Sequence, residues 1–373
     1  MKELVDKLRS LLGGASEHPV FPKVELVGAP VLGPEGVTVS LRVGDVVEGP
    51  VPMERAADLY EARERAIKLE AEDPYHYGYE PRFWAEVDWL VAELRAEFPG
   101  QVIEVCLLGG NRAAKTEYAA KRMCEAMDLN RHWLVWFMHT DQSSSRGVQQ
   151  ERVWKYLPPQ FKPKETGKFR KGVQQRMNYN SSTGFTENCF GLPHGCRAVF
   201  KFYSGDADSL EGDQPHVVWS DERIPLNWIK ALAVRLLTRA GQTEQLAKEL
   251  RVLLQARAAG GVDEVPRELR ARMWQGVHLV TFTPLDGLTP AVSRFVDGAQ
   301  TVLAQEAREL PVVGPNDVVT GFAMLPRVKR QPGAPVAAAW FWNVDNKHGG
   351  NHEGMRKLAR QERWSDAEKK INF

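Results

Sequence analysis

The sequence predicts an α/β protein with a mainly parallel central sheet flanked by helices. Apolar runs that indicate buried strands alternate with segments of helical period between residues 102 and 282. The runs are continuously apolar, as expected for parallel strands that are covered on both faces. Gly and Pro residues separate the segments and mark the turns between them.

The composition is that of a folded protein without a strong overall charge. Of the 373 residues, 43% are hydrophobic and 26% are charged, which argues against a disordered chain. The 49 basic and 48 acidic residues nearly cancel, so any contact with nucleic acid must be a local patch. The four cysteines are widely spaced without a CxxC pair, which argues against zinc. Without a signal peptide or a long apolar run, the sequence predicts a reduced, cytoplasmic protein outside the membrane.

The first 70 residues predict a small N-terminal extension. Strand-like fragments at 24–27 and 37–43 are separated by Gly and Pro, which indicates a β-rich piece. A charged, Ala-rich helix is expected over residues 53–72, and Asp73-Pro74 ends it.

Helices and strands then alternate through a main domain that is predicted over residues 71–330. Helices are expected at 82–98, 115–127, 147–156 and 226–239. Strands are expected at 102–108, 133–138, 186–191, 197–203, 217–219 and 277–282. The charged, Ala-rich stretch 242–274 predicts a helical insertion, and residues 331–373 predict a linker or lid segment.

The strongest chemical motif is Gly109-Gly-Asn-Arg-Ala-Ala-Lys-Thr116, between a predicted strand and a predicted helix. Backbone N–H groups at a helix start can bind phosphates, Lys115 would reach the β and γ oxygens, and Thr116 would offer its hydroxyl to Mg²⁺. The usual pattern has Gly before the Lys, and Ala114 could crowd the phosphates or require a backbone angle that Gly tolerates better. The alternative is an ordinary turn with a surface lysine. The predicted ATP-binding residues here are Gly109, Gly110, Asn111, Arg112, Ala113, Ala114, Lys115, Thr116 and Glu117.

A second motif is the acid pair Asp221-Glu222, directly after an apolar strand. In a phosphoryl-transfer site, the first acid would hold Mg²⁺ and the second would act as the base that orients the attacking water. The alternative is a solvated strand end. We expect this strand to neighbour the strand before the phosphate loop, with both loops at one edge of the sheet.

A third motif, Thr281-Phe-Thr-Pro, follows the last predicted strand. The hydroxyls of Thr281 and Thr283 could sense the γ-phosphate and transmit its loss through a hydrogen bond that changes on hydrolysis. The alternative is a Thr-Pro turn with local side-chain bonds.

In this order, the three motifs resemble those of the large terminase subunits of tailed phages. The family's loop, Gly-Gly-Asn-Arg-x-Gly-Lys-Thr-Glu, is similar to residues 109–117 apart from Ala114. The family often continues Glu-Pro after the acid pair, where this chain has Arg223-Ile-Pro225. Its coupling motif resembles residues 281–289, and its adenine-proximal segment resembles residues 73–84. Tyr79 and Trp84 in that segment are therefore candidates for stacking on the base, with core packing as the alternative.

The resemblance covers residues 73–373 and implies a P-loop NTPase of the additional-strand, catalytic-Glu type. It implies a motor that uses ATP and Mg²⁺ to move double-stranded DNA into a procapsid. It also implies the portal protein and the small terminase subunit as partners, a homo-oligomeric ring, and a location in the host cytoplasm and transiently at the procapsid portal. Residues 341–373 resemble the segment before the family's nuclease domain, so nuclease activity is not expected in this chain.

Several cations are candidates for further roles. Arg235 and Arg239 could reach a neighbouring subunit's γ-phosphate, and Arg112 could act in cis, although any of them could be a surface residue. The basic stretch 162–176 could contact DNA phosphates or be a plain exposed loop. Other functions compatible with the motifs are a helicase-like or other DNA-dependent P-loop ATPase, and an assembly scaffold with a decayed nucleotide site.

Overall fold

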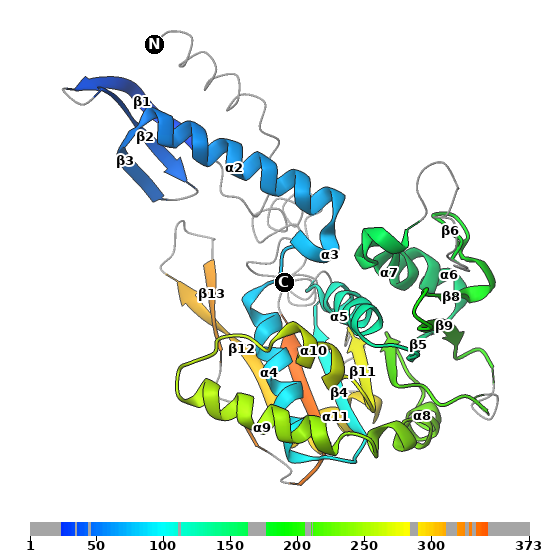
Figure 1. Ribbon diagram of the computed structural model, residues 1–373. Helices are drawn as coiled ribbons and strands as arrows, with labels where there is room; N and C mark the ends of the chain where they lie inside the picture. Colours follow the sequence, from blue (N-terminus) through cyan, green and yellow to red (C-terminus); the bar gives the residue numbers. More distant parts are fainter. Residues whose placement is uncertain are drawn as a thin grey trace. The chain divides into compact units, whose positions relative to one another are not determined.

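The chain forms two compact units, Met1–Tyr79 and Glu80–Phe373 (Figure 1). The computed structural model describes residues 24–33, 36–43, 46–110, 113–162, 177–205, 210, 212–283, 290–310, 319–324, 328–329 and 333–341. No helix among these residues is both long enough and apolar enough to cross a membrane.

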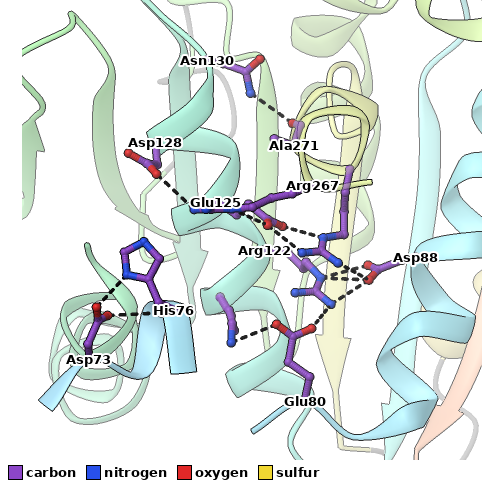
Figure 2. Close-up of polar contacts among 12 residues, drawn as sticks. Asp73, His76, Glu80, Asp88, Arg122, Glu125, Asp128, Asn130, Arg267 and Ala271 are labelled. Carbon is purple, nitrogen blue, oxygen red and sulfur yellow. Dashed lines mark hydrogen bonds and ion pairs between the residues drawn. The ribbon is translucent and has the colours of Figure 1, made fainter. Parts of the chain in front are cut away.

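The first unit contains a three-stranded antiparallel sheet followed by two helices. The sheet has the order β1 (Val24–Gly33), β2 (Gly36–Val43), β3 (Val46–Pro52), and α2 (Met53–Glu72) and α3 (Pro74–Tyr77) follow. The helix α2 ends where expected, because Pro74 begins a new helix and the Asp73 carboxylate accepts the backbone N–H of His76 at 3.2 Å (Figure 2). The unit therefore extends to Tyr79, beyond the predicted end at residue 70.

The second unit is built on one large sheet, which confirms the predicted α/β fold with a mainly parallel sheet. The strand order is β13-β12-β15-β4-β11-β10-β5-β9-β8, and β14 pairs with β12. Every pair from β12 to β9 along this order is parallel, whereas β13, β14 and β8 pair antiparallel. The strands are β4 (Ile103–Gly109), β5 (Leu134–His139), β8 (Cys189–Gly191), β9 (Arg197–Phe202), β10 (Val217–Asp221), β11 (Val277–Phe282), β12 (Thr301–Leu310), β13 (Val319–Met324), β14 (Val328–Lys329) and β15 (Val336–Phe341).

The expectation that the phosphate loop and the acid pair follow neighbouring strands is wrong. The strand β11 lies between β4 and β10, and pairs in parallel with both of them. Alternation along the chain does not fix spatial order, because a crossover helix can carry the chain past a strand position that a later segment fills. All three strands still end at one edge of the sheet, with Thr281 in register with Asp221 on one side and with Leu107 on the other.

Helices cover both faces of this sheet. On one face, α8 (Leu226–Ala240) and α11 (Pro290–Gly298) pack apolar side chains against β4, β10 and β11. On the other face lie α4 (Arg82–Glu97) and α5 (Lys115–Leu129). The predicted insertion forms two helices, α9 (Glu244–Ala258) and α10 (Arg267–Met273), which pack on α4 and α5.

Three predicted elements differ in detail from the structure. The helix expected at 147–156 begins earlier, as α6 (Gln142–Ser145), a π-helical turn (Arg146–Gln150) and α7 (Glu151–Tyr156). It does so because the Asp141 carboxylate caps the backbone N–H of Ser144 at 2.9 Å. The first part of the strand expected at 186–191 is a 3₁₀ turn, Thr186–Asn188. Residues 336–341, assigned from sequence to a linker, form β15 between β12 and β4, so this part of the predicted linker belongs to the sheet.

Candidate active site

Lys115, the lysine of the predicted phosphate loop, is the first residue of α5. The Lys115 ammonium donates hydrogen bonds to the carbonyl oxygens of Gly109 at 3.0 Å and of Gly110 at 2.8 Å. Burial lowers the pKa of Lys115 to about 8, although the nearby carboxylates of Glu222 and Asp221 act in the opposite direction. The loop thus contains a buried cation that faces the acid pair. Asn111 and Arg112 lie outside the described residues, and their proposed contacts with ATP stay predictions.

Ala114 adopts the left-handed backbone conformation that sequence analysis associates with Gly at this position. It has φ 64° and ψ 23°, and it directly precedes the first residue of α5. An L-residue pays about 1–2 kcal/mol for this conformation, whereas Gly adopts it freely. Ala114 therefore adopts a backbone angle that Gly tolerates better, in spite of its methyl group.

The loop and the acid pair meet across β11. The Thr116 hydroxyl lies 3.3 Å and 3.4 Å from the two carboxylate oxygens of Asp221. The Thr281 hydroxyl on β11 donates a hydrogen bond to Oδ1 of the same carboxylate. Hydroxyl and carboxylate oxygens are the ligands that hard cations such as Mg²⁺ prefer, so Thr116 and Asp221 fit a magnesium site.

Asp221 is nearly completely buried at the end of β10. Burial, followed by the neighbouring charge of Glu222, raises the pKa of Asp221 to about 7, although Thr281, Lys115 and Thr116 favour its ionised form. Perturbed pKa values are concentrated at functional sites, because catalytic and ligand groups need pKa values matched to their tasks.

Glu222 differs from Asp221 in both exposure and conformation. It is partly exposed, and its φ of 64° places a non-glycine residue in the left-handed region. Its backbone N–H donates to the Thr281 carbonyl at 2.8 Å, and its carboxylate accepts from the Thr283 hydroxyl at 3.3 Å. Strained backbone of this kind is concentrated at functional sites. The two acids are therefore suited to different tasks.

Trp219 also contacts this group of residues and was not among the residues predicted from the sequence. Its indole N–H donates to the Thr281 hydroxyl at 2.8 Å. The available signal was strand geometry, because residues two apart on a strand point to the same face and Trp219 lies two residues before Asp221.

Three other predicted ATP-binding residues have different surroundings. The Glu117 carboxylate, in the first turn of α5, forms ion pairs with Arg152 at 2.7 Å and with Lys155 at 3.0 Å. Trp84 is 1% exposed, and its ring contacts the ring of Tyr118 with a centroid distance of 5.5 Å. Trp84 is thus a core residue, the alternative that sequence analysis left open. Tyr79 is the last residue of the first unit, and its backbone N–H donates to Glu70 at 3.0 Å.

The two arginines proposed to act in trans both lie on α8. Arg239 is in the last turn of the helix and donates to the backbone carbonyl of Gln214 at 3.4 Å. Gln214 precedes the first residue of β10, so Arg239 lies at the sheet edge opposite to the acid pair. Arg239 is therefore remote from the acid pair of its own chain, and its action in trans stays a prediction. Arg235, one turn earlier, is partly exposed.

Buried ion pairs fix α5 to its neighbouring helices (Figure 2). The Arg122 guanidinium binds Asp88 of α4 at 2.7 Å and Glu80 at 2.6 Å. Arg270 of α10 binds Glu125 of α5 at 2.7 Å. Burial works against ionisation of Glu80, but Arg122 and Lys121 hold its pKa well below the usual range. The helix that carries Lys115 and Thr116 is therefore anchored by charged contacts along its length.

No protein-family model matches the sequence, and no curated protein matches it significantly. One sheet edge brings together a buried ammonium, a pair of oxygen ligands and a partly exposed carboxylate, and this combination suits phosphoryl transfer.

Proposed function

We propose that the chain is a P-loop ATPase of the additional-strand, catalytic-Glu type, which binds ATP and Mg²⁺ at the shared edge of β4, β11 and β10. The observation that carries this proposal is the contact of Thr116 with Asp221 across β11. It joins the phosphate loop to the acid pair with an additional strand between them. An ordinary turn with a surface lysine would not require that contact, nor a buried Lys115.

Each residue has a distinct task in this mechanism. The Lys115 ammonium, which bonds two loop carbonyls in the free protein, would exchange them for phosphate oxygens. Thr116 and Asp221 would hold Mg²⁺, which when bound supplies positive charge that stabilises the transferred phosphoryl group. Glu222 would accept a proton from the attacking water and orient it. Thr283 bonds the Glu222 carboxylate and would restrain its direction until water is in place.

The resemblance of the three motifs to those of tailed-phage large terminase subunits supports a wider proposal, that hydrolysis drives double-stranded DNA into a procapsid. The portal protein, the small terminase subunit and further copies of the chain in a ring would be the partners. The basic stretch 162–176 would contact DNA phosphates, and of this stretch only Lys162 is among the described residues. A decayed scaffold is disfavoured, because the loop keeps its turn at Ala114 and its contact with Asp221.

Two substitutions test the catalytic assignment. We expect Lys115→Ala to lose ATP binding, because the loop would lose its buried cation. Glu222→Gln should bind ATP with near wild-type affinity and lose at least about 100-fold in turnover, because the amide cannot accept a proton. Equilibrium binding of a fluorescent ATP analogue and steady-state phosphate release measure the two effects.

Matched controls exist on the insertion helices. Lys248→Ala and Glu268→Gln change the same residue types at exposed positions and should leave both measurements unchanged.

Turnover with and without linear double-stranded DNA, together with a strand-separation assay, distinguishes a packaging motor from a helicase. The absence of Mg²⁺-dependent turnover in the wild type, or the same behaviour of the two site variants, would contradict the assignment.

A further inference from the structure

A buried tryptophan on β10 begins a chain of hydrogen bonds that ends at the proposed magnesium ligand. We infer that Trp219 is a positioning residue for Asp221 and acts through the Thr281 hydroxyl. The indole N–H of Trp219 lies 2.8 Å from Thr281 Oγ1, which in turn contacts Asp221 Oδ1. This inference rests on the proposed function, because it gives the relay its purpose in holding Mg²⁺.

The donor and acceptor roles in this chain are fixed by chemistry. An indole N–H can only donate, so the Thr281 oxygen is the acceptor in the first bond. The single hydroxyl proton of Thr281 is then directed away from Trp219. It has two acceptors within reach, Asp221 Oδ1 and the Ser220 carbonyl oxygen at 3.4 Å, and the Asp221 contact is the shorter. Trp219 thereby keeps the hydroxyl turned so that its proton points at the carboxylate.

Packing prevents Trp219 from moving away from this position. Its side chain is fully buried, and its ring meets the ring of Phe137 on β5 edge-on with a centroid distance of 5.7 Å. Trp219 and Asp221 point to the same face of β10, and Thr281 lies opposite Asp221 in the parallel pairing with β11. Two strands therefore hold the three groups in a fixed order.

The relay determines how the carboxylate faces the phosphate loop. With Oδ1 held by Thr281, Asp221 cannot rotate without breaking a buried hydrogen bond, and Oδ2 stays 3.4 Å from the Thr116 hydroxyl. Some groups do not bind the metal but orient a metal ligand through a hydrogen bond. Removing such a group commonly changes metal affinity about 10–100-fold. The indole N–H should therefore affect Mg²⁺ binding without contacting the ion or the nucleotide.

Trp219→Phe tests this role because it removes the N–H and keeps an aromatic ring. Trp89→Phe is the matched control. Trp89 lies on α4, outside the site, is also fully buried, and its N–H donates to the Asp263 carbonyl at 3.0 Å. Both variants lose one indole hydrogen bond, buried at Trp219 and part-buried at Trp89, and the same side-chain volume. The readout is the fluorescence of N-methylanthraniloyl-ADP bound to the full chain while Mg²⁺ is titrated. We expect the half-saturating Mg²⁺ concentration to rise about tenfold in Trp219→Phe and to stay unchanged in Trp89→Phe. The affinity for ADP measured without Mg²⁺ should be the same in Trp219→Phe and in Trp89→Phe.

A double-mutant cycle tests whether Trp219 acts through Thr281. In a Thr281→Val background, the hydroxyl is gone and Trp219→Phe should change the Mg²⁺ requirement no further. Equal Mg²⁺ requirements in Trp219→Phe and Trp89→Phe would overturn the inference, as would a full Trp219→Phe effect in the Thr281→Val background.

If Trp219→Phe does not fold, Thr281→Ser and Thr281→Val take its place. Only Thr281→Val should raise the Mg²⁺ requirement, and equal values would overturn the relay. A wild-type chain that binds ADP in no condition would overturn the proposed function as well.

Discussion

Ala114 combines a left-handed backbone with a side chain that disfavours it, at the residue that precedes the proposed phosphate-binding lysine. The methyl group costs about 1–2 kcal/mol in this conformation, whereas the additional backbone entropy of an unfolded Gly is about 0.5–1 kcal/mol. The strain of Ala is therefore larger than the entropic cost of Gly. The strain is therefore a local property that a single substitution can remove.

We expect Ala114→Gly to raise the free energy of unfolding by about 0.5–1 kcal/mol, because Gly adopts a φ of 64° without strain. Urea denaturation followed by circular dichroism measures the change. Ala113→Gly is the control, because Ala113 is buried and is not among the residues with positive φ, so Gly should destabilise the chain there. An Ala114→Gly variant that is no more stable than wild type would show that the turn carries no strain.

Asp221 is a second residue at which local stability and the proposed function oppose each other. Its pKa in the folded chain is about 7 against 3.8 for a free carboxyl, so the folded state binds the proton more tightly than the unfolded state. Stability contributed by the protonated form is therefore lost as pH rises from about 4 to 7. Asp221→Asn removes this loss.

Without nucleotide and Mg²⁺, Asp221→Asn should be more stable than wild type at pH 8, by on the order of 3 kcal/mol, and nearly equal to it at pH 4. The same variant should lose Mg²⁺-dependent ATP turnover. Chemical denaturation at the two pH values, with turnover measured in parallel, tests both parts. A difference in stability that does not depend on pH would contradict the raised pKa of Asp221.

At the scale of elements, α5 depends on buried charges as well as on apolar packing. Asp88 of α4 accepts hydrogen bonds from the Arg122 guanidinium and, at 2.7 Å, from the Tyr118 hydroxyl, so one carboxylate serves two side chains of α5. Burial raises the pKa of Asp88, and the positive charge of Arg122 works against that rise. Removing the carboxylate would leave a buried guanidinium without its main partner.

Asp88→Ala should lower the free energy of unfolding by about 3–5 kcal/mol, as expected when one member of a buried ion pair is lost. Glu249→Ala is the control, since Glu249 pairs with Arg272 at 2.7 Å between two more exposed side chains, and such pairs contribute at most about 1 kcal/mol. Denaturant titrations of the two variants measure the contrast. Similar losses in both would mean that the contacts around α5 are no more important than surface ion pairs.

The strands with continuous apolar runs could be predicted from sequence, and β15 could not, for a physical reason. β4, β5, β10 and β11 are buried on both faces and therefore have continuous apolar runs. β15 contains three consecutive alanines, which favour a helix, and only pairing between β12 and β4 makes this segment a strand.

The same contrast holds in the candidate site. The predicted loop and acid pair have a signal in the sequence, because each proposed chemical task needs particular residue types in consecutive positions. Trp219 could not be assigned in this way, since its role depends on a hydrogen bond to a strand that is distant in sequence. The left-handed turn at Glu222 has no marker in the sequence either, because Gly or Asn would be the usual residues there.

At the scale of the whole molecule, the position of β11 determines when the site can exist during synthesis. Neighbouring strands lie about 4.8 Å apart, so without β11 the ends of β4 and β10 would be separated by one empty strand position. β11 begins at Val277, after both of the strands that it joins. A nascent chain that has emerged only as far as β10 carries the phosphate loop and the acid pair but cannot bring them together. On the proposed function, such an intermediate would not hydrolyse ATP, and activity would begin only after β11 has paired with both strands.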